Sequence, residues 1–247
     1  MRKLSLGVVL ASMLFALAVA CFGGREACAQ EPGEIVTGIP WSDDERAEYV
    51  LLDHDDLEEC GTGTFTVERQ GDQYQFTLRF EDLDGENSDT STVIVDDETL
   101  QPFSIRRERV IDGDTEAVEG EYDRAEKVIR VIEYTGDDPR EVPRRLDEEV
   151  YYDNESSLFI WRTIRFEVGY QAKYNTVLAN QGGAVREIRL RVREKEEVTV
   201  PAGTFDAWRV DIAGDVDQVA FFADTPEHQL IFYDNSVQIF QLVSFEP

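Results

Sequence analysis

A strand–turn–strand pattern at residues 198–212, VTVPAGTFDAWRVDI, says more about the possible fold than any other segment. Residues 198–200 alternate apolar and polar side chains, as expected for a strand with two unlike faces. Pro201 and Gly203 then interrupt the run, because proline offers no N–H to a strand ladder and glycine tolerates a positive φ. Residues 204–212 resume the alternation, so the segment predicts two antiparallel strands joined by a tight turn.

Similar short alternating runs, separated by turn residues, continue from residue 48 to the C-terminus. Phe76, Leu78 and Phe80 alternate with polar residues, and Asp112-Gly113 is a favoured hairpin turn. Strands joined by short turns form an antiparallel meander, and a sheet of about eleven strands has to curl. We therefore expect a mainly β protein with one large antiparallel curved sheet, a half-barrel or a barrel, and one short helix.

The short helix is predicted over residues 155–163. Asp153 and Asn154 are good N-cap residues, and the acidic side chain of Glu155 suits the first turn of a helix. Leu158 and Trp161 follow at helical spacing. We expect this helix to cover the open side of the curved sheet.

Residues 1–20 indicate export from the cytoplasm. Two basic residues precede an apolar stretch that is too short to span a bilayer comfortably, which is the pattern of a secretory signal peptide. Two cleavage sites remain open. A lipobox ends at Cys21, which would then carry the lipid, whereas ordinary signal peptidase would cut after Ala29.

Cysteine pairing and chain organisation follow from the choice of cleavage site. If Cys21 is lipidated, Cys28 and Cys60 remain and can form a disulfide in an oxidising compartment. Residues 21–46 are rich in Gly, Glu, Pro and Asp and are predicted to be a flexible tether, followed by a single antiparallel β domain over 47–247. We expect a cell-envelope lipoprotein that meets the membrane only through its N-terminal anchor, or else a periplasmic or extracellular protein.

The chain is strongly acidic, with 52 Asp and Glu residues against 24 Lys and Arg, and a net charge of −28. Such a surface repels nucleic acid and anionic head groups, so neither is expected as a direct ligand. Solubility accounts for the charge, and recruitment of a basic partner is the alternative. Arg189, Arg191 and Arg193 share one face of a predicted strand, where they form either a cross-strand ladder with acidic neighbours or an anion site.

Motifs for catalysis or metal binding are missing from the sequence. His54 and His228 are the two histidines, and neither zinc-binding spacings nor serine-nucleophile motifs occur. Residues 53–60 form an acidic run that is typical of a solvated loop, with weak calcium binding as the alternative. Paired carboxylates of a glycosidase stay open as a third hypothesis. We expect no enzyme activity, no cofactor and no metal.

Aromatic residues on the predicted strands suggest a ligand. An ordinary β core accounts for them, and a concave apolar face that binds an acyl chain or another amphipathic molecule is the functional alternative. The candidate ligand-binding residues are Phe76, Phe80, Phe103, Trp161, Trp208, Phe222 and Phe232.

The segment VPAGTFDAWRV (200–210) resembles a signature of the bacterial domain-of-unknown-function family numbered 3108, whose members are exported envelope proteins. Further similar segments are 95–102, 154–169 and 238–243. The resemblance covers about residues 48–245 and implies a curved antiparallel sheet similar to lipoprotein and lipid carriers, with no catalytic residues to assign.

We therefore expect a non-catalytic envelope protein, a lipoprotein in the preferred form, that binds or carries a lipid or another apolar or amphipathic ligand in its concave face. The alternative is a structural or assembly module that contacts other envelope proteins through sheet edges or its acidic surface.

Overall fold

The computed structural model describes residues 33–134 and 139–247. Fifteen strands in this part of the chain form one sheet, in the order β8-β7-β6-β5-β4-β3-β2-β1-β15-β14-β13-β12-β11-β10-β9. The strands are β1 (Asp44–Asp53), β2 (Glu59–Arg69), β3 (Gln73–Asp82), β4 (Ser88–Asp96), β5 (Pro102–Ile111), β6 (Asp114–Asp123), β7 (Val128–Tyr134), β8 (Arg140–Arg145), β9 (Tyr152–Asp153), β10 (Gln171–Leu178), β11 (Ala184–Val200), β12 (Gly203–Ala213), β13 (Asp217–Ala223), β14 (Leu230–Asp234) and β15 (Gln238–Glu246).

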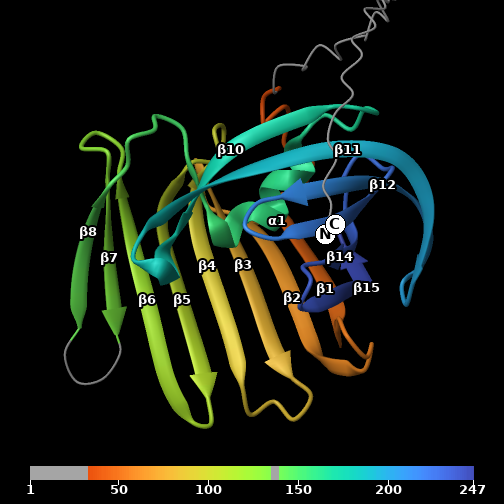
Figure 1. The fold of residues 1–247 in the computed structure, drawn as a ribbon, viewed down its shortest axis with the longest axis horizontal. Coiled ribbons are helices and arrows are strands. Elements are labelled where there is room, and N and C mark those ends of the chain that lie inside the picture. Colours follow the sequence, from red (N-terminus) through yellow and green to blue (C-terminus); the bar gives the residue numbers. More distant parts are fainter. Residues whose placement is uncertain (1–32, 135–138) are drawn as a thin grey trace, which may run out of the picture. The chain divides into compact units, whose positions relative to one another are not determined.

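The pairing confirms the predicted antiparallel meander. Consecutive strands are neighbours almost throughout, β9 and β10 form the parallel pair, and β1 pairs with the last strand, β15. The sheet is curved but unclosed, because β8 and β9 lie at its two ends (Figure 1). The sheet of the described residues has fifteen strands where the sequence predicts about eleven, and the edge strand β8 carries no clear alternation of polar and apolar residues. Pro143 lies in the middle of this strand, and an edge strand tolerates a proline there because it has neighbours on one side only.

The helix predicted at residues 155–163 is present, but its α-helical part is short. A 3₁₀ turn η1 (Asn154–Ser156), the helix α1 (Ser157–Ile160) and a second 3₁₀ turn η2 (Trp161–Thr163) follow one another, and we call residues 154–163 the inner helical segment. As predicted, the carboxylate of Asp153 caps the start, accepting a hydrogen bond from the N–H of Glu155 at 2.8 Å.

The inner helical segment packs into the concave side of the sheet (Figure 1). Alternating residues of β1 to β4 point toward it, as their alternating burial shows. The ring of Phe159 stacks on that of Phe76 with centroids 4.4 Å apart, and Phe65 lies 6.2 Å from Phe159. The aromatic centre of the concave face is therefore a packed core around this segment.

A buried ion pair ties the inner helical segment to β1. The guanidinium of Arg162 donates to both carboxylate oxygens of Glu45 at 2.5 and 3.0 Å, and to the carbonyl oxygen of Glu227 at 2.7 Å. Both charged side chains are only 3% exposed. The hydrogen bonds to Glu45 and to the carbonyl oxygen of Glu227 offset the cost of removing this guanidinium from water.

The structure differs from the predicted tether over its second half. Gly33 bridges to Ala172 beside β10, and the N–H of Thr37 donates to the carbonyl oxygen of Thr163 at 2.9 Å. Ile35 and Trp41 are buried, and the Trp41 indole packs edge-on against core aromatic rings. These apolar side chains join residues 33–43 to the core although the segment is rich in turn-forming residues.

The predicted signal peptide, Cys21, Cys28 and the site after Ala29 lie outside the described residues. Cys60 lies in β2, half-buried, with its thiol 3.5 Å from the carbonyl oxygen of Leu51. In the described part of the chain, no helix has the length and hydrophobicity needed to span a bilayer.

Candidate ligand site

Three of the predicted ligand residues belong to the packed core. Phe76, Trp161 and Phe222 are 1%, 3% and 0% exposed. The Trp161 indole N–H donates to the hydroxyl of Tyr174 at 2.8 Å, which satisfies the polar atom of a buried ring. These side chains stabilise the fold and offer no free surface to a ligand.

Three others lie apart from one another at partly exposed positions. Phe103 packs under the guanidinium of Arg124, 4.5 Å from its ring centroid. The Trp208 indole N–H donates to the carboxylate of Asp224 at 2.8 Å. Phe232 packs edge-on against Phe221, with centroids 5.7 Å apart.

Bulges explain why Phe232 and Phe103 depart from the predicted inward set. The pairing of β13 with β14 shifts between Phe221 and Phe222, so Phe232 lies opposite Phe221, on the face away from the buried Phe222. The pairing of β4 with β5 shifts between Ile94 and Val95, next to the start of β5. A bulge inserts one residue and reverses the alternation beyond it, which a strict period of two does not anticipate.

Phe80 alone of the predicted set lines one of the cavities that we describe on the concave face. This first cavity has a volume of about 180 Å³. Its apolar lining includes Leu51, Phe80 and Ile111, and its polar lining includes Asp89 and Arg109.

A second cavity has a volume of about 320 Å³. It is lined by Arg107, Arg109, Glu116, Ala117, Val118, Glu133 and Asn180. Asn180 comes from the 3₁₀ turn η3 (Ala179–Gln181), which packs over β6. Arg109 lines both cavities, and we call the two together the rim groove.

Strand register brings the groove residues into one row. Phe80 lies opposite Asp89, Asp89 opposite Arg109, and Arg109 opposite Glu116, across β3 to β6. Paired residues of neighbouring strands point to the same face of a sheet. The row therefore runs from an aromatic side chain to a set of charges along the concave face.

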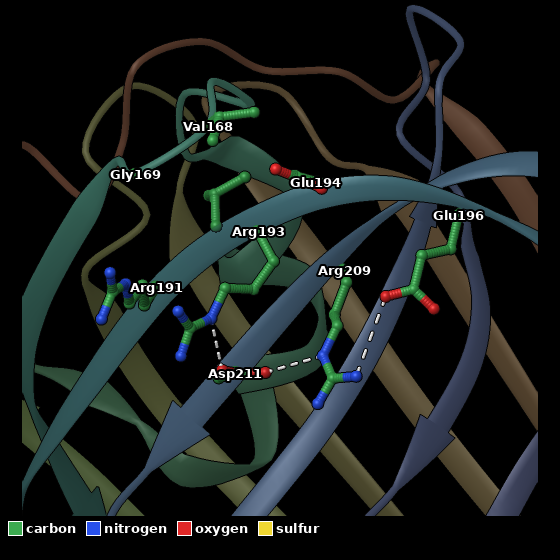
Figure 2. A pocket seen from close by; sticks show the side chains of 9 residues that line it. Val168, Gly169, Arg191, Arg193, Glu194, Glu196, Arg209 and Asp211 are labelled. Atoms are coloured by element: carbon green, nitrogen blue, oxygen red, sulfur yellow. Dashed lines mark hydrogen bonds and ion pairs between the residues drawn. The ribbon is translucent and has the colours of Figure 1, made fainter.

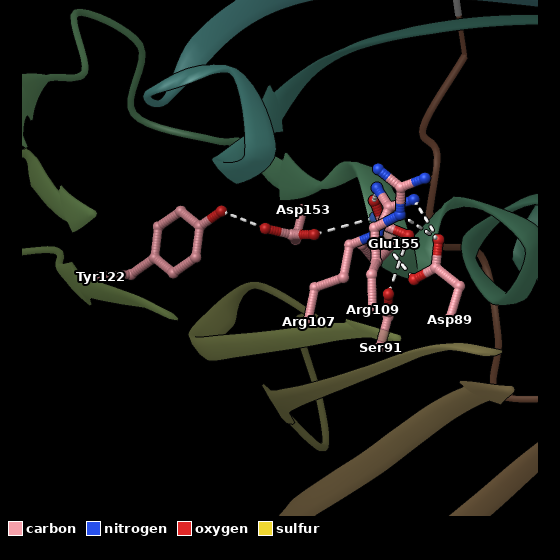
Figure 3. Close-up of polar contacts among 7 residues, drawn as sticks. All are labelled: Asp89, Ser91, Arg107, Arg109, Tyr122, Asp153 and Glu155. Atoms are coloured by element: carbon pink, nitrogen blue, oxygen red, sulfur yellow. Dashed lines mark hydrogen bonds and ion pairs between the residues drawn. The ribbon is translucent and has the colours of Figure 1, made fainter. Parts of the chain in front are cut away.

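The charges of the row are linked to the inner helical segment (Figure 3). Arg107 donates to both oxygens of Asp89 at 2.9 and 2.6 Å and to Glu155 at 3.1 Å. The hydroxyl of Ser91 donates to the other oxygen of Glu155 at 3.2 Å. The hydrogen bonds that Arg107 donates to Asp89 raise the pKa of Arg107, so this guanidinium stays charged.

Asp153 lies behind this network and is 0% exposed. Its carboxylate accepts a hydrogen bond from the hydroxyl of Tyr122 (Figure 3). Burial, followed by the negative charge of Glu155, raises the pKa of Asp153 to about 7. Burial also raises the pKa of Tyr122, so the phenol stays a hydrogen-bond donor.

The histidines and the acidic loop have local partners. His54 Nδ1 lies 2.9 Å from Asp234, and the ring of His228 lies 4.2 Å from that of Phe166. In the acidic run, the carboxylates of Asp53 and Asp56 accept backbone N–H groups of the same loop. Across residues 33–134 and 139–247, no group of three or more His, Cys, Asp and Glu side chains is placed to hold a metal ion.

Two residues of the predicted arginine face, Arg191 and Arg193, line a shallow surface site on β11 and β12 (Figure 2). Asp211 accepts from Arg193 at 2.6 Å and from Arg209 at 2.9 Å, and Arg189 pairs with Glu187 at 2.7 Å. Arg193 therefore pairs across the strands with Asp211, as in the ladder that the sequence suggested, whereas Arg189 pairs with Glu187 of its own strand.

A family model described as "Protein of unknown function (DUF3108)" matches residues 52–245. The chain belongs to the DUF3108 family. The segment VPAGTFDAWRV lies within this match and forms the turn and first part of the β11–β12 hairpin, so the resemblance seen in the sequence is confirmed.

Among solved structures, the chain is similar to a β-barrel-like protein of the domain-of-unknown-function family DUF1849 from Brucella abortus. The TM-score is 0.51 at 11% identity, covering 82% of this chain and 97% of that one. A Bacteroides fragilis NCTC 9343 protein with a YmcC-like fold gives a TM-score of 0.32 at 10% identity, covering 85% and 98%. No curated protein matches the sequence. The first similarity shows the fold alone, and the second is too low to add to it.

Proposed function

We propose that this DUF3108 protein is a non-catalytic cell-envelope protein that binds an amphipathic ligand on its concave sheet face, at the rim groove. One observation carries the proposal. The row from Phe80 to Glu116 places apolar and charged side chains next to one another in open cavities of about 180 and 320 Å³. Mixed apolar and polar linings of this kind suit small-molecule sites.

The groove replaces the centre of the concave face as the expected binding place. The centre is occupied by the inner helical segment, whose Phe159 stacks on Phe76. At the groove, Ile111 is 41% exposed and Leu51 and Phe80 form the adjoining lining. An acyl chain would bury the exposed part of Ile111, and its polar end would reach Arg109.

Binding is proposed in preference to catalysis because the charged groups between the groove and the inner helical segment are already paired. Arg107 pairs with both Asp89 and Glu155, so the hydrogen-bonding groups of these three side chains are engaged with one another. A general acid or base needs a proton affinity near neutrality and access to substrate. Asp153, whose pKa is raised to about 7, is buried behind the groove.

Export and lipidation belong to the same proposal. The apolar stretch within residues 1–20 and the lipobox at Cys21 support anchoring in the envelope, where amphipathic molecules are abundant. Intact-mass measurement of the membrane fraction tests it: a mature chain that begins at a lipid-modified Cys21 is expected, and one that begins at Gln30 would contradict the anchor. The same measurement after thiol alkylation shows whether Cys28 and Cys60 are joined.

The binding proposal is tested with the neutral fluorophore N-phenyl-1-naphthylamine, whose emission rises in apolar surroundings. Ile111→Asp places a charge in the groove and is expected to weaken binding at least about tenfold, because a charge opposes burial of apolar surface. Val243→Asp is the matched control, since Val243 is 43% exposed and does not line the groove. Equal loss in both variants, or no binding by the wild-type protein, would contradict the proposal.

A further inference from the structure

The rim groove presents opposite charges that do not neutralise each other. Arg109 in β5 lies directly opposite Glu116 in β6, and both line the larger cavity. Cross-strand neighbours on one face lie close enough for long side chains to meet. Within the described residues, however, no carboxylate oxygen of Glu116 lies within 4.0 Å of the Arg109 guanidinium.

Arg109 has hydrogen-bonding capacity to spare. Its nearest carboxylate oxygen belongs to Asp89, at 3.5 Å from Nε, which is too long for a good hydrogen bond. Asp89 already accepts two short hydrogen bonds from Arg107. A guanidinium has five N–H donors, so Arg109 can still bind an acidic oxygen in a bidentate manner.

The opposite wall of the cavity offers carboxylates with weak partners. Glu133 in β7 is 26% exposed, and its nearest cation is Arg140 at 4.0 Å. Glu116 forms no ion pair with any described residue. Two carboxylates with open acceptor positions face the same 320 Å³ space as Arg109.

We propose that the larger cavity binds a zwitterionic head group, in which an acidic oxygen contacts Arg109 and an ammonium contacts Glu116 and Glu133. This inference rests on the proposed amphipath binding and specifies its ligand class. The two carboxylates would repel a purely anionic head group, and Arg109 would repel a purely cationic one. Only a molecule with both charges can pair with all three side chains. The net negative charge of the protein does not repel such a ligand, because a zwitterion carries no net charge.

The smaller cavity gives the head group a direction. Arg109 lines both cavities, and Leu51, Phe80 and Ile111 line the smaller one, to which Glu116 does not belong. A ligand whose acidic group is attached to an alkyl chain places the chain against these side chains when its ammonium points toward Glu133. The order chain, acidic oxygen, ammonium is that of a phosphoethanolamine amphipath.

Calorimetric titration of the full chain tests the inference with octyl phosphoethanolamine, octyl phosphate and octylamine, each below its micelle-forming concentration. The zwitterion is expected to bind at least about tenfold more tightly than either singly charged compound, since one charge-assisted contact contributes about that factor. Arg109→Gln is expected to weaken the zwitterion and the phosphate about tenfold and to leave the amine unweakened. Glu133→Gln is expected to weaken the zwitterion and the amine and to spare the phosphate.

Arg106→Gln is the matched control, because Arg106 lies on the same strand with its side chain on the opposite face, paired with Glu108 and Glu119. It should leave all three affinities unchanged. Equal affinities for the three compounds, unaffected by Arg109→Gln, would overturn the zwitterion inference and leave amphipath binding intact. Failure of all three to bind would instead contradict the proposed function.

Glycerophosphoethanolamine, which lacks the alkyl chain, distinguishes a free zwitterion from a lipid as the source of the ligand. Binding as tight as that of the octyl compound would indicate a free zwitterion.

Discussion

At the residue scale, Asp153 is expected to make stability depend on pH. Its pKa is raised to about 7 in the folded protein from 3.8 as a free side chain, so the folded state binds the proton more tightly than the unfolded state does. Ionisation above pH 7 therefore opposes folding, and stability from this group is gained as pH falls from about 7 toward 4.

Asp153→Asn removes this titration while keeping a side chain that can cap the inner helical segment. We expect the variant to be more stable than wild type by roughly 2 kcal/mol at pH 8, and the difference to shrink by pH 5. Urea unfolding at both pH values measures it. The same pH slope in both proteins would show that Asp153 does not titrate in this range.

The ion pair between Arg162 and Glu45 gives a second expectation. Arg162→Met leaves the carboxylate of Glu45 buried without a partner and is expected to cost about 3–5 kcal/mol. The double variant Arg162→Met/Glu45→Leu should recover most of this loss, because neither charge is then buried. Arg46→Gln, at an exposed ion pair beside it, should change the urea midpoint little. Equal losses in the single and double variants would contradict this account.

Sequence reasoning found one residue of the candidate site and missed the rest. Phe80 stood out because aromatic residues at period two predict an inward face. Arg109 and Asp89 share that face, but polar residues at inward positions look like a loop or an outward face when only one strand is considered. The register across β3 to β6 places these residues in one row of the candidate site. No single segment of the sequence specifies that register.

At the scale of elements, the inner helical segment controls how much of the concave face is free. Phe159→Ala removes the ring stacked on Phe76 and is expected to destabilise the protein by about 3–5 kcal/mol. It should also open an apolar space at the centre of the face and increase binding of N-phenyl-1-naphthylamine. Phe221→Ala, a half-buried ring on the other face, is the control and should do neither to the same extent.

The edges of the sheet bear on the alternative assembly role. The edge beyond β10 is covered by β9 and by Gly33, and the β8 edge carries Pro143 with Arg140, Arg144 and Arg145. Proline and charged residues at an edge oppose pairing with another chain. We expect Pro143→Thr combined with Arg145→Val to increase self-association in light scattering, whereas wild type should not depend on concentration. No change in the double variant would argue that the edge is shielded in another way.

At the scale of the whole molecule, the high negative charge opposes compactness. With a net charge of −28, the folded chain holds like charges closer together than the unfolded chain does. Raising the ionic strength from about 0.05 to 0.5 M screens this repulsion and is expected to raise the melting temperature by a few degrees. Sodium chloride and potassium chloride should act alike, and an unchanged melting temperature would show that local ion pairs already balance the charge.

The meander could be predicted from the sequence, but its extent could not. Hairpin turns such as Asp112-Gly113 appear as local signals, and the structure has the β5–β6 hairpin there. The sequence indicates about eleven strands and the described residues form fifteen; β8, which contains a proline, and β9, which has two residues, leave weak local signals. The sheet is curved but unclosed because of these strands and the bulges. Bulges produce no periodic pattern in the sequence, so the absence of closure could not be predicted.

The pairing of β1 with β15 has a consequence for how the molecule is made. The earliest strand of a chain that is delivered from its N-terminus finds one of its two neighbours only when the last segment arrives. Until then, its outer hydrogen-bonding edge stays open in the middle of the future sheet, and the closing loop spans nearly the whole domain. We therefore expect completion to be slow and all-or-none, so that a chain shortened by its final dozen residues would be left without a mature form rather than with a slightly smaller one.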